Sequence, residues 1–242
     1  MPQLPSRRQA GTINLMKKPW IPYAAPFILF LAITGLGQSF PANRDIIYIA
    51  KTIVVGLLLW FWRRRYTQDI TPKLTPAGYL TALTTGLLVL FLWIAPENFL
   101  PQLGSPVGFN PYAFGWAPNA VPGLIAVRLA GATLVVPVME ELFWRSFIMR
   151  YAINPDFRTV PLGTFSIFSF TVTALLFGLE HHRVIQGILA GIVYAQLVIK
   201  QKTLKGCILA HATTNLCLGI YCTLKIGFSG RMAEGGTHHI NP

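Results

Sequence analysis

The chain has 242 residues, of which 53% are hydrophobic and 12% are charged. With a mean hydropathy of +0.51, it cannot be an ordinary soluble domain, because such domains carry about 25% charged residues. The formal net charge of +12 could suggest nucleic-acid binding, but the basic residues lie between apolar runs, where they set the orientation of a membrane protein. The composition therefore predicts an integral membrane protein that binds no nucleic acid.

Seven apolar runs are each about long enough to cross a hydrocarbon core of roughly 30 Å as a helix. They are Trp20–Phe40, Ile46–Trp62, Tyr79–Ile94, Val121–Met139, Thr164–Leu179, Val184–Ile199 and Gly206–Leu224. The sequence thus predicts an all-α fold, a polytopic transmembrane helical bundle of about seven helices, with six to eight as the range. Residues 1–19 are expected to form a basic cytoplasmic arm, 20–226 a single transmembrane domain, and 227–242 a flexible tail.

The distribution of basic residues predicts the orientation. With the N-terminus inside, fourteen Lys and Arg residues fall in inner segments, Arg145 and Arg150 among them, and four fall in outer segments. Cytoplasmic segments of membrane proteins carry such an excess. We therefore expect a cytoplasmic N-terminus.

Two acidic residues follow the fourth apolar run. An ionisable side chain at the centre of a membrane helix costs about 2.5 to 3.5 kcal/mol, so its presence usually marks a site. Glu141 and Arg145 are four residues apart on one helix face and are expected to form a structural ion pair. Glu140 points about 100° away and has no local partner, which suits a general base. Pro137 should free the carbonyl of Thr133 and open space beside Glu140.

The fifth run ends in a polar cluster. Phe177 and His181 share a helix face, and Glu180 and His182 are the neighbours of His181. A histidine at a helix end is more often a cap than a catalyst, and spacing alone leaves His182 as an alternative to His181 for any catalytic role.

The last apolar run contains a third pair with the same spacing. His211 and Asn215 share one face about a turn into the run. Taken alone, the pair would be interpreted as a hydrogen bond between helices.

Together, the motifs Glu-Glu-x-x-x-Arg, Phe-x-x-x-His and His-x-x-x-Asn on successive runs resemble the CAAX-protease and bacteriocin-processing family, also called the Abi family. This family contains the type II CAAX prenyl endopeptidases and many prokaryotic intramembrane proteases. The resemblance covers 121–224, and the segment Val136-Pro-Val-Met-Glu-Glu-Leu-Phe-Trp-Arg is similar to CAAX-protease-related proteins associated with exosortase sorting systems. The first three runs carry no motif.

The resemblance implies hydrolysis of a peptide bond in a membrane-anchored protein or peptide, in a bacterial cytoplasmic membrane. Glu140 would be the general base, and His181 would orient the attacking water. His211 and Asn215 would stabilise the oxyanion. The supporting residues would be Glu141, Arg145 and Phe177.

Cofactor use stays open at this point. Glu140, His181 and His211 could hold a zinc ion, and the family is often labelled a metalloprotease family. The spacing differs from the compact His-Glu-x-x-His motif, so water activation without a metal is the preferred mechanism. A second class of function is a non-enzymatic membrane protein, either a proton or ion relay or a scaffold that binds lipid or peptide.

One expectation conflicts with the proposed site. By hydropathy, Glu140 and His211 lie near the inner surface, whereas His181 ends the fifth run near the outer surface. A shared catalytic water requires the three to meet. Either 142–163 contains a re-entrant piece that shifts the fifth run, or the predicted boundaries are wrong.

Overall fold

The computed structural model describes residues 18–104 and 110–235, with side chains as far as residue 225. Within these residues every regular element is helical. The long elements are α1 (Ile21–Ser39), α2 (Arg44–Trp62), α4 (Pro76–Ile94), α8 (Ile167–Leu179), α9 (Val184–Gln201), α10 (Leu204–Gly235) and a continuous run made of α5 (Val121–Ala130), η5 (Gly131–Val135), α6 (Val136–Glu141), η6 (Leu142–Ile148) and α7 (Met149–Tyr151). Short helices occupy the connections: η2 (Pro41–Asn43), η3 (Arg63–Arg65), α3 (Thr67–Ile70), η4 (Pro111–Phe114) and η7 (Phe157–Thr159).

The predicted fold class is confirmed. Six helical stretches in the described residues are long and apolar enough to cross a membrane, and α8 is a shorter apolar helix of 13 residues. Each of the seven predicted runs corresponds to one of these stretches. The chain is therefore a polytopic helical membrane protein.

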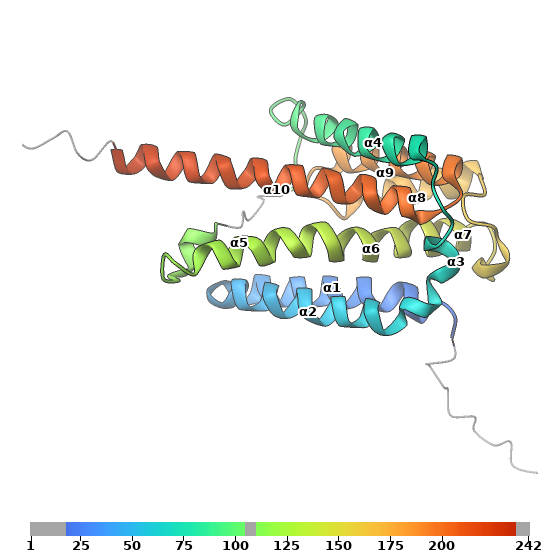
Figure 1. The fold of residues 1–242 in the computed structure, drawn as a ribbon, viewed down its shortest axis with the longest axis horizontal. Helices are drawn as coiled ribbons and strands as arrows, with labels where there is room; N and C mark the ends of the chain where they lie inside the picture. Colours follow the sequence, from blue (N-terminus) through green and yellow to red (C-terminus); the bar gives the residue numbers. More distant parts are fainter. Residues whose placement is uncertain (1–17, 105–109, 236–242) are drawn as a thin grey trace, which may run out of the picture.

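The continuous run α5–α7 is the centre of the bundle. It lies between the α1–α2 hairpin on one side and α4, α8, α9 and α10 on the other (Figure 1). Leu57, Trp60, Leu80 and Phe91 are exposed on the outer helix faces. Apolar residues on the outside and charged residues within are the arrangement that a lipid environment selects.

The boundaries predicted for the fourth span were wrong, which removes the conflict over depth. The helical run does not end at Met139 but continues to Tyr151, so that it has 31 residues. Arg145 and Arg150, which were assigned to an inner segment, are instead buried within the protein. Arg150 Nη2 lies 3.3 Å from the carboxylate of Asp69. Glu140 consequently lies well inside the bundle, at a depth that the end of the short helix α8 can also reach.

The helical run is irregular next to Pro137. Residues Gly131–Val135 form a π-helix immediately before α6, and Asn215 Nδ2 donates to the carbonyl of Ala132 at 2.9 Å. The sequence predicted that Pro137 frees the carbonyl of Thr133. The carbonyl that accepts a hydrogen bond from another helix is instead that of Ala132, the preceding residue. π-segments within α-helices are frequent at functional sites.

The last helix also extends beyond its predicted end. Helix α10 continues to Gly235 rather than ending at Leu224. The tail predicted for 227–242 therefore begins within the helix, and 236–242 lie outside the described residues, as does most of the predicted arm 1–19.

The close crossing of α4 and α10 brings His211 and Asn215 toward the centre, and it predicts an effect of mutation. A Cβ on Gly86 would collide with the carbonyl oxygen of Ala210 and would lie 2.8 Å from Thr213 Cβ. We expect Gly86→Ala to destabilise the protein by about 1 to 3 kcal/mol, as overpacking does. Thermal unfolding in detergent measures the change.

The matched control is Gly35→Ala in α1, where a Cβ meets nothing within 4 Å. Alanine has the higher helix propensity, by about 1 kcal/mol, so Gly35→Ala should be neutral or stabilising. Equal melting temperatures for the two variants would show that the crossing tolerates a methyl group.

Candidate active site

The side chains of the three sequence motifs meet at one cavity. Glu140 from α6, His181 from the end of α8, and His211 and Asn215 from α10 all line a space of about 170 Å³. Phe177 lines it as well. Three segments that are distant in the chain thus supply polar groups to one small volume inside the bundle.

Glu141 is the hydrogen-bonding centre behind this cavity. Its Oε1 lies 3.2 Å from Arg145 Nη1 and accepts from His211 Nδ1 at 2.9 Å, and its Oε2 accepts from Cys207 Sγ at 2.9 Å. The carboxylate is completely buried. It therefore ties the central run to α10 by charge-assisted bonds that water does not weaken.

The guanidinium of Arg145 extends the same network to α8 and α9. Its Nη2 donates to the carbonyl of Gly191 at 3.4 Å, and its Cζ lies 4.2 Å from the centroid of the Phe177 ring and 5.5 Å from that of Tyr194. Stacking on aromatic faces stabilises a desolvated cation. The predicted Glu141–Arg145 ion pair is present, and Phe177 packs against it.

The hydrogen bonds of the two histidines decide which ring nitrogen faces the cavity. His181 Nδ1 is 2.7 Å from the carbonyl oxygen of Phe177, and His211 Nδ1 is 2.9 Å from Glu141 Oε1. Because these oxygens can only accept, both Nδ1 atoms carry hydrogen. Nε2 of each ring is left for the site, and His211 Nε2 lies 3.9 Å from Glu140 Oε2.

His182 does not face this cavity. Its Nδ1 is 2.8 Å from the carbonyl oxygen of Leu103, and its own carbonyl accepts from the Leu103 amide at 2.8 Å. The side chain is exposed. Of the two adjacent histidines, His181 is the one that lines the cavity with Glu140.

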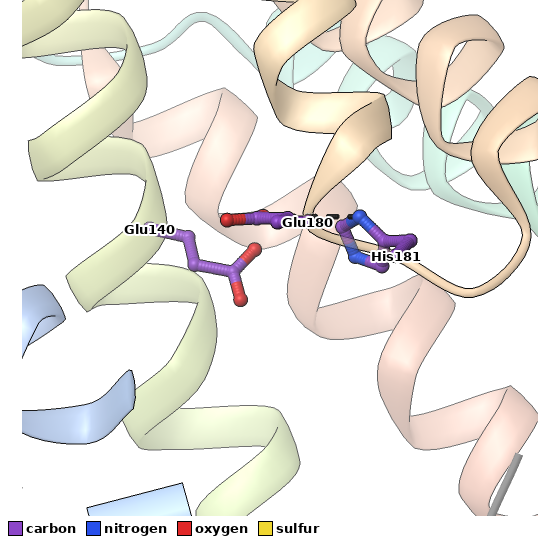
Figure 2. A group of neighbouring side chains, drawn as sticks. All are labelled: Glu140, Glu180 and His181. Atoms are coloured by element: carbon purple, nitrogen blue, oxygen red, sulfur yellow. Dashed lines mark ion pairs between the residues drawn. The ribbon is translucent and has the colours of Figure 1, made fainter. Parts of the chain in front are cut away.

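Glu180 is a site residue that the sequence motifs did not include. Figure 2 shows its side chain between Glu140 and His181, and ligand atoms of these three residues lie within 4.8 Å of one another. Glu180 Oε2 accepts from Trp144 Nε1 at 3.2 Å, whereas Glu180 Oε1 and Glu140 Oε2 are buried without a hydrogen-bond partner. Two buried acceptors that converge in this way require a proton, a water molecule or a cation between them.

Burial also shifts the pKa values of two side chains in the connection between α8 and α9, those of Glu180 and His181. Desolvation raises the pKa of Glu180 to about 8 and lowers the pKa of His181 to about 4. At neutral pH the His181 ring is therefore uncharged, and its Nε2 offers a lone pair to the cavity.

The donor set fits a divalent metal ion. Within the described residues, Glu140, Glu180 and His181 have mutually close ligand atoms, and His211, the third ligand predicted from the sequence, lines the same cavity. Carboxylate oxygen and imidazole nitrogen are ordinary zinc ligands. The bond from His181 Nδ1 to the Phe177 carbonyl is of the kind that orients a ligating histidine.

Two further residues at the site carry no motif. Tyr194 stacks on the His211 ring, with centroids 5.0 Å apart, and its hydroxyl donates to Thr214 Oγ1 at 2.7 Å. Cys207 bonds Glu141 from one turn before His211. In the sequence both residues resemble ordinary core positions. Their contacts with the site, from Tyr194 to His211 and from Cys207 to Glu141, are visible only in the packed helices.

Comparison with known proteins agrees with this geometry. Residues 122–217 match a family model described as type II CAAX prenyl endopeptidase Rce1-like. The segment is therefore similar to this family of endopeptidases. This confirms the resemblance to the CAAX-protease family, whereas the finer similarity to exosortase-associated proteins stays a prediction.

The match to this family model covers less than half of the chain. It begins in α5 and ends in α10, so it contains every motif residue, and α1, α2 and α4 lie outside it. No curated protein and no solved structure matches the chain. The family supports a membrane endopeptidase of the CAAX-protease type.

The Glu141 network predicts a strong dependence of stability on this carboxylate. Glu141→Gln removes the charge that faces Arg145 in a fully buried setting. Breaking one partner of a buried ion pair costs about 3 to 5 kcal/mol, so we expect a large fall in thermal stability in detergent.

Glu97→Gln is the matched control. Glu97 forms a 2.7 Å ion pair with Arg183, but both side chains are partly exposed, at 26% and 21%. Loss of an exposed pair costs about 1 kcal/mol or less. If Glu141→Gln and Glu97→Gln have the same melting temperature, the central role of the buried carboxylate is contradicted.

Proposed function

We propose that the protein is an intramembrane endopeptidase that hydrolyses a peptide bond of a membrane-associated protein or peptide by means of an activated water molecule. The observation that carries this proposal is the shared cavity of Glu140, His181, His211 and Asn215. The Rce1-like family match supports the same type of reaction.

Glu140 is the general base in this proposal. Its Oε2 is buried without a hydrogen-bond partner and borders a cavity large enough for water, so it can take a proton from a water molecule placed there. His181 Nε2 accepts the other hydrogen of that water and orients it. Among the described residues that line the cavity, none is a serine or a cysteine, which favours water as the attacking group.

The oxyanion is stabilised from α10. When the water oxygen bonds to the carbonyl carbon, the carbonyl electron pair moves to oxygen, and the resulting charge needs donors. Asn215 Nδ2 donates one hydrogen to the carbonyl of Ala132, and its second hydrogen can be donated to the oxyanion. His211 Nδ1–H is engaged by Glu141, so any donation from His211 to the oxyanion must come from a hydrogen on Nε2, the ring nitrogen that lies 3.9 Å from Glu140 Oε2.

Collapse of the tetrahedral intermediate completes the reaction. The carbon–nitrogen bond breaks, and the proton held by Glu140 passes to the leaving nitrogen, which gives an amine and a carboxylic acid. If a zinc ion binds, Glu140, Glu180 and His181 would hold it, and it would acidify a bound water.

The excess of basic residues in the predicted inner segments supports the orientation of the enzyme, and we infer that its N-terminus is cytoplasmic. We infer from the family resemblance that the membrane is the bacterial cytoplasmic membrane. The substrate is a membrane-anchored protein or peptide, and membrane lipid surrounds the enzyme.

Substitution of the base or of the water-orienting histidine tests the mechanism. We expect Glu140→Gln and His181→Ala each to lower the cleavage rate of a membrane-anchored peptide library by about 10² to 10⁴-fold, the usual contribution of general acid–base catalysis. His182→Ala, whose side chain faces Leu103, should stay within about twofold of the parent. Cleavage in proteoliposomes is followed by mass spectrometry.

Unchanged cleavage in both Glu140→Gln and His181→Ala would reject the mechanism. If the parent protein cleaves no peptide but dissipates a pH gradient across the same proteoliposomes, the result supports the alternative function as a proton or ion relay.

Asn215 gives a separate test of oxyanion stabilisation. Asn215→Ala should lower kcat by about 10² to 10³-fold. Thr213→Ala is the matched control, because Thr213 is a neighbour on α10 whose hydroxyl donates to the Leu209 carbonyl within the helix. A fall in kcat of equal size in both variants would mean that α10 is sensitive to any change.

Chelation tests the role of metal. Because the preferred mechanism uses water activated by side chains alone, we expect extensive dialysis against a strong chelator to leave kcat unchanged. Loss of activity that returns with stoichiometric zinc, and does not return in Glu180→Gln, would replace this mechanism with a metal-dependent one.

A further inference from the structure

A second set of basic side chains lies largely outside the protease motifs. Lys51, in α2, is 6% exposed. Its Nζ donates to Thr34 Oγ1 at 2.8 Å, and it lies 3.9 Å from the centroid of the Phe30 ring and 5.0 Å from that of Tyr48. Within 18–104 and 110–225, no carboxylate forms an ion pair with Lys51.

A buried ammonium in a membrane helix is strongly unfavourable without a counter-charge. A neutral hydroxyl and two aromatic rings compensate only part of the lost hydration. The position of Lys51 therefore calls for an anion.

A cavity suited to an anion lies beside this lysine. It has a volume of about 390 Å³, and Arg44, Lys51, Arg128 and His182 line it, whereas none of the described residues that line it is acidic. Asp45, which follows Arg44, accepts from the indole Nε1 of Trp116 instead. We call this space the cationic cavity.

The basic groups approach the cationic cavity from one end of the bundle. Lys51 and Arg128 each lie seven residues after the first residue of their helices, Arg44 and Val121, which is about 10 Å along each axis. Both helices begin at the same end of the bundle (Figure 1). Since side chains lean toward the helix N-terminus, both cations reach back toward that membrane surface, where lipid headgroups lie.

An apolar pocket borders both the cationic cavity and the active-site cavity. It has a volume of about 460 Å³, and it shares Tyr48 and Arg128 with the cationic cavity and Val136, Asn215 and Leu218 with the active-site cavity. Its lining is mostly apolar. A peptide backbone in such a lining would leave N–H and C=O groups without partners, whereas an acyl chain has none to satisfy.

We propose that the cationic cavity binds the phosphate of an anionic phospholipid, with one acyl chain of that lipid in the adjoining apolar pocket. The charge of the phosphate matches Lys51 and Arg44, and the chain would reach the wall that the pocket shares with the active site. The bound lipid would then be a neighbour of the catalytic residues, and this assignment does not depend on the protein being a protease.

Competitive lipid binding tests the proposal. The full-length protein, purified in a neutral detergent, is mixed with equimolar phosphatidylglycerol and phosphatidylcholine of identical acyl chains, and the retained lipid is measured by native mass spectrometry. We expect retention of phosphatidylglycerol to exceed that of phosphatidylcholine by about tenfold, because both lipids carry a phosphodiester but the choline of phosphatidylcholine adds a positive charge that the basic residues of the cavity repel.

Three variants locate the site. Lys51→Met and Arg44→Gln should each lose most of the preference, whereas Lys200→Met, an exposed lysine at the end of α9, should keep it at the same change in net charge. Melting temperatures in lipid-free detergent identify a variant that fails to fold. Because Arg44 is only half-buried, we expect Arg44→Gln to disturb the packing less than Lys51→Met.

Three results would overturn the proposal. One is equal retention of the two lipids, and another is a full preference in both Lys51→Met and Arg44→Gln. The third is displacement of phosphatidylglycerol by an apolar peptide with a free C-terminal carboxylate but not by its amide, which would assign the cavity to a peptide terminus.

Discussion

The fully buried carboxylate of Glu141 organises both the helix packing and the candidate site. It compensates the charge of Arg145, fixes the Nδ1 hydrogen of His211 and receives the thiol of Cys207. A carboxylate in hydrocarbon is stable only with such partners. The same bonds therefore hold the central run against α10 and set the ring of His211 so that Nε2 points toward Glu140, which makes stability and site geometry two results of one network.

The membrane explains why the polar groups of this protein are concentrated inside it. Lipid-facing surfaces offer no partner to a backbone or side-chain polar group, so irregular helix and charge are confined to the interior. The π-helix at Gly131–Val135 illustrates this, because its Ala132 carbonyl accepts from Asn215 rather than facing lipid. Lys51 follows the same rule at the other end of the bundle, where its surroundings are a cavity and not a carboxylate.

Local spacing was enough to find most of the candidate site, because residues four apart on a helix share a face. The pairs at Glu141 and Arg145 and at His211 and Asn215 were recognised in this way. Glu180 was not, since its contact with Glu140 joins two helices and follows no spacing rule. The choice between His181 and His182 was also beyond the sequence, because it depends on how the chain turns after α8.

The class of this protein can be predicted from local sequence, because apolar runs of membrane length require helices and charged groups within them require an internal site. The depth at which these groups meet depends instead on contacts between helices, which no local pattern specifies. Hydropathy ended the fourth span at Met139 because it counts Glu140, Glu141 and Arg145 as polar. In the folded chain Glu141 pairs with Arg145 within the run and accepts hydrogen bonds from His211 and Cys207 of α10. The span therefore continues to Tyr151, and Glu140 lies beside His181 at one cavity.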